Sequence, residues 1–334
     1  MFFEIFFLFV ITLIIYQIFK RVAKKINLID IPNSRSSHQS PTIRGFGVVI
    51  FLSIGITLLA FKSFLIINHP SLLFSILIIG LLGLADDIKP VKPLIKISTL
   101  LLAYIFLYDE GFLISNLGVY LGFELKLHSL FAIIFTALSI TTFTNAFNLI
   151  DGLDGLSGSV ALIIFLSFLY IGFKNNDMLM LNTSVLFVTS LLVFIFLNWH
   201  PAKVFLGDSG SLMIGFVISI LAVRSLNYIE PVSILYITAV PIIDFLFVTI
   251  SRILNRTSIL LADKGHCHHI LLRYFKGSIK KTVISISIFQ ALSCFIGIII
   301  ISKGKDSLIA LILFSLFFFI VFKVLNAIKF KKIS

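Results

Sequence analysis

Long apolar runs, separated by short polar segments, recur along almost the whole chain. A helix that crosses about 30 Å of hydrocarbon needs roughly 20 apolar residues, and eleven runs approach that length. They are residues 2–19, 46–67, 71–85, 93–108, 129–147, 157–173, 181–198, 209–226, 232–250, 282–302 and 307–325. The pattern predicts an all-α polytopic membrane protein with about 11 transmembrane helices.

One segment follows a different pattern. Residues 111–127 alternate between apolar and polar side chains around Gly118 and Gly122. Alternation of this kind is typical of strands joined by a turn, so we expect a short extracytoplasmic hairpin here. Neither a fixed-period repeat nor a low-complexity linker interrupts the chain, and residues 1–334 are therefore predicted to form a single domain.

Composition agrees with a membrane protein. Of 334 residues, 59% are hydrophobic and 13% charged, whereas soluble domains carry about a quarter charged residues. These figures exclude collagens and disordered tails, and two cysteines are too few for a disulfide framework. The net charge of +12 could indicate a nucleic-acid partner. In a membrane protein it more often reflects basic cytoplasmic loops, so we expect no nucleic-acid partner.

Lysine and arginine residues are distributed unequally between the two ends of the predicted helices. Of the 27 in the chain, 21 fall on one side and 6 on the other. Because cytoplasmic loops carry the excess of these residues, we expect the N-terminus outside and the C-terminus in the cytoplasm.

Six acidic residues lie at or beside helix ends on the predicted cytoplasmic side. They are Asp86, Asp87, Asp151, Asp154, Asp208 and Asp263. Charged residues near hydrocarbon are costly, which makes them candidates for function. Carboxylates gathered at one membrane face repel one another unless a cation lies among them, and Mg²⁺ prefers oxygen ligands. The sequence therefore favours an Mg²⁺ site at this face, with Mn²⁺ as the alternative ion.

The pair Asp86–Asp87 ends the third predicted helix. Mutual repulsion in such a pair raises one of the two pKa values and creates a candidate base. The alternative interpretation is a hydrated loop start beside basic residues.

The segment NLIDGLDGLSGS contains an asparagine and two aspartates spaced by three residues. On a helix, Asn148, Asp151 and Asp154 would lie along one face. The neighbouring Gly152 and Gly155 would let a phosphate or ribose approach the backbone. The alternative is a glycine-rich turn between two helices.

The segment FLGDSGS opens the eighth predicted helix, with its N-terminal end at the cytoplasm. Free N–H groups and the helix dipole favour anions there. Asp208 is either an N-cap or a ligand of a metal whose other ligands are phosphate oxygens. Phe205 could stack on a nucleobase, although a single phenylalanine in this chain is more often buried or lipid-facing.

Two basic loops carry further candidates. The sequence HCHH, residues 266–269, lies in the loop 251–281 and lacks the partners of a closed zinc site. Its imidazoles are more plausible as phosphate ligands or proton carriers, and a surface cluster is the alternative. In the first loop, Arg44 with His38 and Thr42 forms a candidate anion clamp.

Four segments in this order resemble the polyprenyl-phosphate N-acetylhexosamine-1-phosphate transferases: GLADDIKP, NAFNLIDGLDGLSG, FLGDSGS and DKGHCHHILL. These enzymes belong to the O-antigen and common-antigen initiating type of glycosyltransferase family 4. The phospho-N-acetylmuramoyl-pentapeptide transferase is a distant relative. The resemblance covers residues 28–275 approximately.

The resemblance implies a bundle of ten or eleven helices with an active-site cleft at the cytoplasmic face of the bacterial inner membrane. It implies Mg²⁺-dependent transfer of a sugar-1-phosphate from a UDP-N-acetylhexosamine to undecaprenyl phosphate, with release of UMP. Such a reaction initiates a cell-surface polysaccharide of O-antigen, common-antigen or teichoic-acid type. The resemblance leaves the sugar, the pathway and a homodimer open.

The resemblance also implies residue roles. Asp86 would be the base on the lipid phosphate, with Asp87 beside it, although which of the two acts stays open. Asp151 and Asp154 would complete the catalytic set by lining the nucleotide-sugar site. The metal would be held by Asn148 and Asp208, and the substrate would be bound by Arg44, Phe205, His266, His268 and His269.

Two departures from the family pattern are visible. The basic residue that usually follows the aspartate pair is here Lys89 or Lys92, and Cys267 replaces an aliphatic residue in the histidine motif. Two rival functions use other features. A Mg²⁺-dependent membrane prenyltransferase would need two aspartate-rich motifs but not the histidines, and a transporter would place polar residues near the midplane, where only Asp244 lies.

Overall fold

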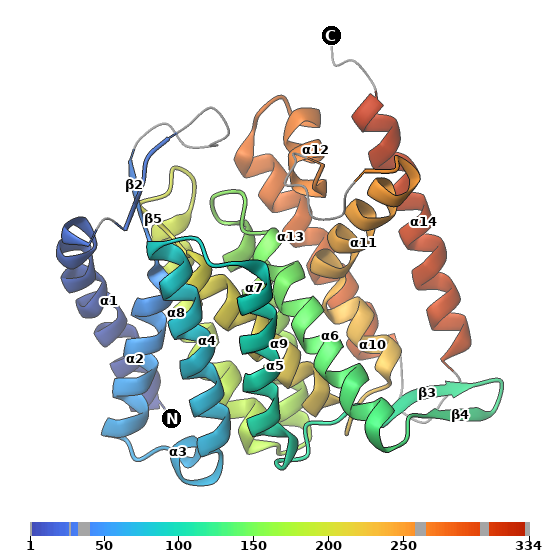
Figure 1. Cartoon of the computed structure of the whole chain (residues 1–334), viewed down its shortest axis with the longest axis horizontal. Coiled ribbons are helices and arrows are strands. Elements are labelled where there is room, and N and C mark those ends of the chain that lie inside the picture. Colours follow the sequence, from blue (N-terminus) through green and yellow to red (C-terminus); the bar gives the residue numbers. More distant parts are fainter. Residues whose placement is uncertain (1, 27, 33–40, 258–264, 301–306, 331–334) are drawn as a thin grey trace.

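The computed structural model describes residues 2–26, 28–32, 41–257, 265–300 and 307–330 as a bundle of helices (Figure 1). The helices are α1 (Phe2–Lys25), α2 (Phe46–Ala60), α3 (Phe64–Asn68), α4 (Pro70–Ile88), α5 (Pro93–Tyr108), α6 (Ser129–Leu149), α7 (Leu156–Lys174), α8 (Met178–Asn198), α9 (Asp208–Ser225), α10 (Pro231–Ile237), α11 (Ala239–Leu254), α12 (Cys267–Tyr274), α13 (Ile279–Phe295), a π-helical extension (Ile296–Ile300) and α14 (Leu308–Phe330). The strands are β1 (Ile29–Asp30), β2 (Thr42–Arg44), β3 (Asn116–Tyr120), β4 (Phe123–Lys126) and β5 (Val204–Phe205).

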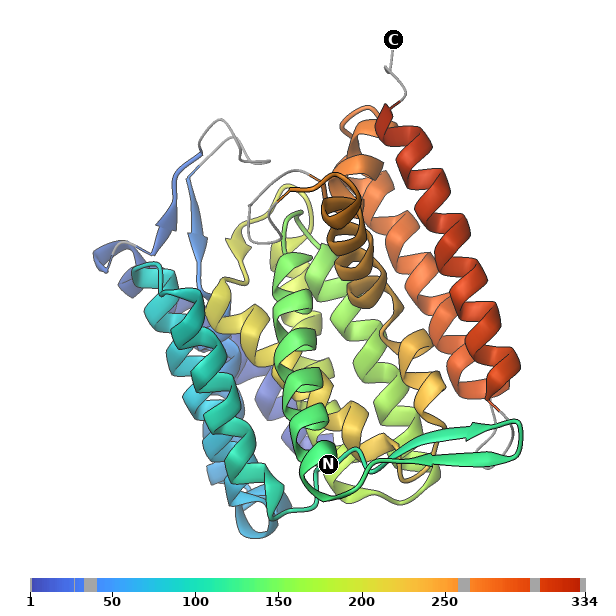
Figure 2. The ribbon, with the colours of Figure 1, turned by 45° about the vertical axis from the view of Figure 1, so that its right-hand side comes forward.

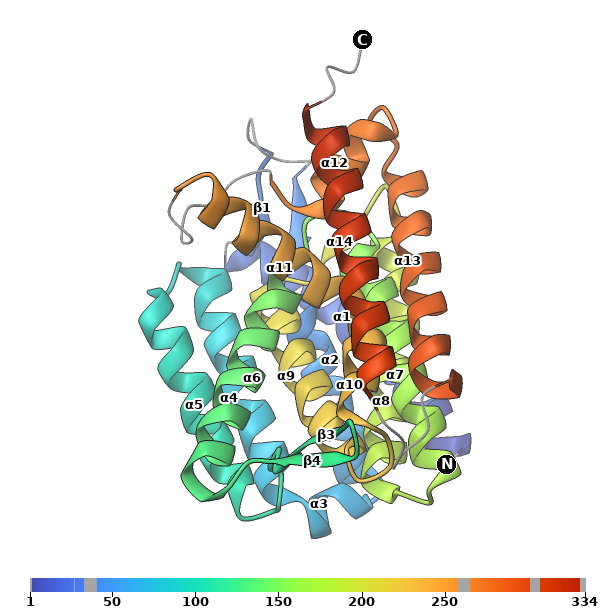
Figure 3. The same ribbon diagram turned by 90° about the vertical axis from the view of Figure 1, so that its right-hand side faces the viewer.

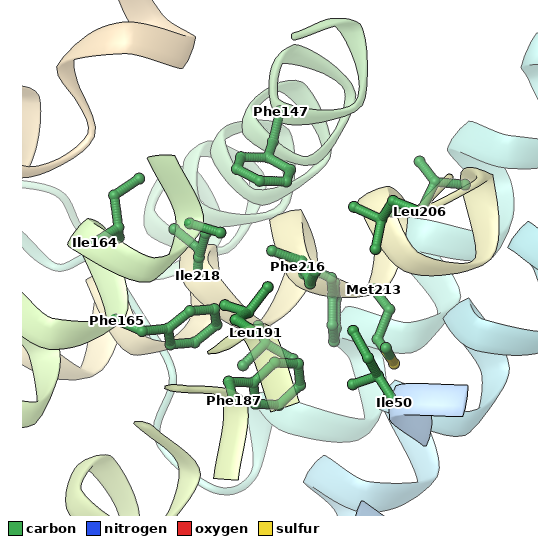
Figure 4. Close-up of a cluster of buried hydrophobic side chains, with 14 of the residues drawn as sticks. Ile50, Phe147, Ile164, Phe165, Phe187, Leu191, Leu206, Met213, Phe216 and Ile218 are labelled. Atoms are coloured by element: carbon green, nitrogen blue, oxygen red, sulfur yellow. The ribbon is translucent and has the colours of Figure 1, made fainter. Parts of the chain in front are cut away.

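Helix α9 is the centre of the bundle. Of its apolar window, 89% is buried, against 17% for α14 at the periphery. Its core-facing side chains, including Met213, Phe216 and Ile218, pack against residues of α2, α6, α7 and α8 (Figure 4). Small residues along α9, such as Gly210 and Gly215, let neighbouring backbones approach closely. The helix that opens with Asp208 is therefore held on every side.

In the described residues, each of the eleven predicted apolar segments lies mainly on one helix or on two successive helices, and these helices differ in length. Among the residues that the structure describes, eight helices are long and apolar enough to cross a membrane, and the pair α10–α11 passes the same test as one bent span. Helices α2 and α5 are apolar but shorter, with 15 and 16 residues. The polytopic character is confirmed, while the count of eleven crossings and the orientation stay predictions.

The segment predicted as one helix over residues 46–67 is divided. Helix α2 ends at Ala60, and the chain turns through Lys62, which has a positive φ of 46°. Ser63 then starts α3 by accepting a hydrogen bond from the backbone N–H of Leu65, at 3.4 Å. The expectation of a single helix was wrong because the apolar pattern continues across this turn.

The ninth predicted segment is broken at Thr238, where α10 and α11 meet at 86°. Pro241 lacks an N–H, and its ring would clash with the carbonyl oxygen of Ile237 in a continuous helix. The side chain of Gln290, on α13, makes good the loss. It donates to that carbonyl at 2.7 Å and accepts from the N–H of Val240 at 3.0 Å. Backbone groups freed at membrane depth are thus satisfied by a neighbouring helix.

The alternating segment forms the predicted hairpin. Strands β3 and β4 pair antiparallel, with Tyr120 opposite Phe123. The hairpin extends sideways across the end of the bundle opposite β2 and α12 (Figure 2). Leu121 and Phe123 at its turn are exposed.

A second sheet was not predicted. Strand β2 pairs antiparallel with β1 and parallel with β5, in the order β1-β2-β5. Each strand has only two or three residues, too few for a period-two pattern to stand out. The sheet joins the first polar loop to the loop before α9, at the end of the molecule where α12 also lies (Figures 1 and 3).

Candidate active site

Three helices meet backbone to backbone where α9 begins. A Cβ added to Gly47 on α2 would lie 2.0 Å from the nitrogen of Gly210, and one added to Gly83 on α4 would lie 2.4 Å from the carbonyl oxygen of Asp208. No side chain fits at either contact. We call Gly47, Gly83 and Gly210 the glycine junction, and it fixes the position of Asp208 against the end of α4.

Asp87, on α4, caps the N-terminal end of α9. Its Oδ1 accepts from the N–H of Asp208 at 2.9 Å, and its Oδ2 accepts from the N–H of Ser209 at 3.0 Å. The side chain is buried, and free N–H groups at a helix start favour a carboxylate. Gly207 allows the approach, with a φ of +74° and a hypothetical Cβ only 2.6 Å from Asp87 Oδ2. The alternative interpretation of Asp208 as an N-cap is wrong, since Asp208 is the first helical residue and Asp87 supplies the cap.

Asp86 faces the same helix end but has different partners. Its Oδ1 accepts from the N–H of Val91 at 2.6 Å, and its Oδ2 lies 2.6 Å from the Nζ of Lys96. The same Nζ is 2.8 Å from Oδ2 of Asp208. One ammonium on α5 therefore bridges carboxylates on α4 and α9. The sequence missed Lys96, and the two lysines considered there, Lys89 and Lys92, are exposed.

The predicted helical alignment of Asn148, Asp151 and Asp154 is wrong. Helix α6 ends at Leu149, and the chain turns before α7 begins at Leu156. The alternative interpretation, a glycine-rich turn between two helices, describes the fold. The three side chains consequently point to different partners.

Asn148 remains close to α9. Its amide Nδ2 donates to the hydroxyl of Ser211 at 2.7 Å, and Ser211 lies one turn beyond Asp208 on the same helix. The structure thus brings the two predicted metal ligands, Asn148 and Asp208, to one end of α9.

Asp151 accepts a short hydrogen bond from Ser157 and is half-buried. Burial, and then the charges of Asp208, Asp87 and Asp154, raise the pKa of Asp151 to about 7, although the Ser157 hydroxyl lowers it. A cation among these carboxylates would relieve that repulsion.

Asp154 turns away from this group. Its Oδ2 accepts from Nδ1 of His200 at 2.7 Å and from the N–H of Ala202 at 3.1 Å, and the residue is buried. It fastens the loop between α8 and β5, so its contacts are those of a positioning residue.

The histidine segment is held by Asp244 on α11. Asp244 Oδ2 is 2.7 Å from Nδ1 of His266, and its Oδ1 accepts from the N–H of Cys267 at 2.7 Å. His266 and Cys267 lie at the start of α12. Asp244, which was considered only as an acid inside a span, therefore positions the histidine motif.

His268 meets the turn that follows α6. Its ring is buried, and a Cβ added to Gly152 would lie 2.5 Å from its Nε2. Burial lowers the pKa of His268 to about 3. The charge of Asp244 raises this pKa by a smaller amount, and the neighbouring His269 and His266 lower it further. The ring is neutral at ordinary pH, and its buried Nδ1 has no hydrogen-bond partner among the described residues. His269, whose ring centroid is 4.3 Å away, is half-buried.

Replacing Gly152 with Ala is expected to lower kcat/KM by about 10²-fold, the cost of displacing a group near the reacting atoms by about 1 Å. The new methyl group would push the His268 ring from its place. The measurement is the steady-state activity of the purified variant. In a His268→Ala background, Gly152→Ala should cost little more, because the clash has been removed. A full additional loss in that background would contradict the contact.

Arg44 and Phe205 are neighbours in the small sheet, where they pair across β2 and β5. The guanidinium of Arg44 donates to the carbonyl oxygen of Asp87, and its buried Nε has no hydrogen-bond partner within the described part of the chain. Phe205 is half-buried. His38 and Asp263 lie outside the described residues.

The side chains that the structure describes fit an open metal site, in which oxygen atoms of the substrate supply the remaining ligands. They do not form a closed site made by protein ligands alone. Among the described residues, no group of three His, Cys, Asp or Glu side chains is arranged to hold an ion. Mg²⁺ is commonly bound by one or two carboxylates plus substrate phosphates. Asp208 with the amide oxygen of Asn148 supplies that donor set.

An apolar groove of about 940 Å³ runs from this end of α6 to the hairpin. Phe143 and Ala146 line it on α6, and Asn148 lies two residues beyond Ala146. The bend between α10 and α11 forms another wall, with Leu235 and Leu246, and Phe123 of the hairpin lies at the far end. A long apolar molecule could therefore reach the polar cluster from the side.

Comparisons with known proteins agree on one family. The model of glycosyl transferase family 4 matches residues 69–226. The chain is 33% identical, over 315 residues, to a probable undecaprenyl-phosphate N-acetylglucosaminyl 1-phosphate transferase of Bacillus subtilis (strain 168), covering 93% of this chain and 87% of that protein. It is 26% identical, over 324 residues, to the undecaprenyl-phosphate alpha-N-acetylglucosaminyl 1-phosphate transferase of Escherichia coli (strain K12), covering 94% and 88%. A shorter match, 33% over 192 residues, is to the phospho-N-acetylmuramoyl-pentapeptide-transferase of Dictyoglomus turgidum, covering 55% and 59%.

Proposed function

Because this chain belongs to glycosyl transferase family 4, we propose that it transfers an N-acetylhexosamine-1-phosphate from a UDP-sugar to undecaprenyl phosphate. The products are undecaprenyl-diphospho-sugar and UMP. The observation that carries the proposal is the meeting of Asp86, Lys96 and Asp208 at the start of α9. The later part of α9 and the facing side of α6 line an apolar groove. Phosphate chemistry requires the charged cluster, and a lipid acceptor requires the apolar surface. A prenyltransferase or a transporter accounts for neither the histidine motif nor the family match.

The reaction joins two phosphates. An oxygen of the lipid phosphate attacks the β-phosphorus of the UDP-sugar and forms a new P–O bond. The bond from that phosphorus to the bridging oxygen breaks, and UMP leaves with this oxygen on its phosphate. Catalysis of such a step is mostly positioning and charge stabilisation.

Side chains of the cluster divide these tasks. Arg44 and the histidines of α12 bind the diphosphate, and Phe205 lies against the uracil. Asp86 takes a proton from a lipid phosphate that arrives protonated, on the Oδ2 that the flexible Lys96 side chain can release. Both oxygens of Asp87 are instead engaged by backbone N–H groups of α9. Asp151, with a pKa of about 7, is the second candidate for that proton.

A divalent ion, Mg²⁺ or Mn²⁺, would be held by Asp208 and Asn148. When bound, it would neutralise negative charge on the phosphoryl oxygens. The donor chemistry of these two residues supports this choice.

The apolar groove would hold the prenyl chain. Its walls are almost entirely hydrocarbon and phenyl surface, which an isoprenoid tail covers with favourable burial. The groove ends within a helical turn of Asn148, so the phosphate of a tail bound there would arrive beside α9.

The site would face the cytoplasm of a bacterial inner membrane, where UDP-sugars are made. The excess of lysine and arginine at the end of the molecule that carries the site supports this orientation. N-acetylglucosamine is the first sugar to test, given the names of the relatives, and the polysaccharide would be one of the O-antigen, common-antigen or teichoic-acid type.

The bond that breaks can be followed with UDP-N-acetylglucosamine labelled with ³²P at the β-phosphate. We expect the label in the lipid fraction and unlabelled UMP in water, because attack at phosphorus keeps the β-phosphate on the sugar. Attack at the anomeric carbon would instead release labelled UDP and leave the lipid with one phosphate. Labelled UDP as the water-soluble product would refute the proposed reaction. A parallel assay with other UDP-N-acetylhexosamines identifies the sugar.

A further inference from the structure

Lys96 holds together two carboxylates that belong to different helices. Its Nζ is 2.6 Å from Oδ2 of Asp86 and 2.8 Å from Oδ2 of Asp208. The Lys96 side chain is only 19% exposed, although α5 is otherwise largely exposed on its first turns. The ammonium is thus the cation that the structure places between Asp86 and Asp208.

This position is incompatible with a divalent ion on the same oxygen of Asp208. An ion coordinated by that oxygen would lie within a few ångströms of the ammonium, and two positive charges at such a distance repel strongly in a half-buried site. Lysine can leave readily, because its charge sits at the end of a flexible four-carbon stem. The negative charges of Asp86 and Asp208 would then attract the incoming ion.

We propose that Lys96 is a displaceable counter-ion of the metal site. It offsets one of the two negative charges of Asp86 and Asp208 before the metal binds, and it must leave Asp208 when the metal arrives. This inference rests on the proposed function in one respect, that Asp208 is a metal ligand. Its consequence is that the free enzyme binds a divalent ion weakly, since each binding event has to separate an existing ion pair.

The proposal is tested by Mn²⁺ binding to the purified full-length protein in detergent, without nucleotide or lipid, followed by electron paramagnetic resonance of the free ion. We expect Lys96→Gln to bind Mn²⁺ about tenfold more tightly than the wild type, since the competing charge is gone. Lys92→Gln removes the same charge from an exposed residue one turn away, and it should bind Mn²⁺ as the wild type does. Lys96→Arg keeps the positive charge and should retain weak binding.

Lys96→Gln leaves two carboxylates facing each other and could lower the yield of folded protein. The Mn²⁺-dependent rise in unfolding temperature then gives the same comparison on small amounts, and it should be larger for Lys96→Gln than for the wild type. Equal or weaker binding by Lys96→Gln, in a protein whose affinity Asp208→Asn lowers, would overturn the role of Lys96 alone. An affinity that Asp208→Asn leaves unchanged would overturn both the metal site and the displacement that depends on it.

Discussion

Asp208→Asn is expected to lower turnover by about 10²–10³-fold, the usual cost of removing one group that stabilises charge in a transition state. The amide would keep the shape of the side chain but lose the negative charge that pairs with Lys96 and would bind the metal. Its backbone N–H would still donate to Asp87, so α9 should start in the same place. The measurement is transfer from UDP-N-acetylglucosamine at saturating Mg²⁺, normalised to folded protein.

The matched control for Asp208→Asn is Asp109→Asn, which removes a carboxylate from an exposed position after α5. This variant should turn over at the wild-type rate. Near-wild-type turnover by Asp208→Asn at saturating Mg²⁺ would remove Asp208 from the metal site.

Gly83→Ala and Gly80→Ala should change stability in opposite directions, although they add the same methyl group to the same helix. At Gly83 the new Cβ would lie 2.4 Å from the backbone of α9, and at Gly80 the nearest atom is 3.8 Å away. Forcing α4 and α9 apart should destabilise the protein by about 1–3 kcal/mol and inactivate it. Gly80→Ala should stabilise it by about 1 kcal/mol through helix propensity.

The unfolding temperature in detergent, together with activity, measures this pair. On α2, Gly47→Ala and Gly55→Ala offer an independent repetition, because nothing lies within 4 Å of a Cβ at Gly55. If Gly83→Ala were as stable and active as Gly80→Ala, the close contact of α4 with α9 would not exist in solution.

The sequence predicted the helices well because apolar length is a strong local signal. It also predicted that Asp86, Asp87 and Asp208, among six carboxylates, gather at one face, since charges beside hydrocarbon are rare and each stands at a helix end. The division at Lys62 and the bend at Thr238 were missed. In both places the apolar pattern continues while the backbone turns, and at the bend the compensating partner comes from a distant helix.

Residues that act through long-range contacts were harder to predict. Lys96 lies ten positions beyond Asp86, in the first turn of the next helix, and nothing local marks it as a partner of Asp208. Asp244 could have been found, because a carboxylate within an apolar run is unusual. Its partner His266 could not be inferred locally, because 22 residues and a basic loop separate the two in the chain. Roles assigned by motif to Asp86, Asp151 and the histidines stay predictions until variants are assayed.

The cap that Asp87 places on α9 has a consequence for how the chain is made. The N–H groups that satisfy this carboxylate belong to Asp208 and Ser209, more than 120 residues further along. At a synthesis rate of about 5–20 residues per second, they emerge from the ribosome roughly 6–24 s after Asp87 does. During that interval the carboxylate, which lies at the end of α4, needs water or lipid headgroups as its solvent. Insertion of the first helices and completion of the site are therefore separate events in biogenesis, and α9 is the segment whose arrival joins them.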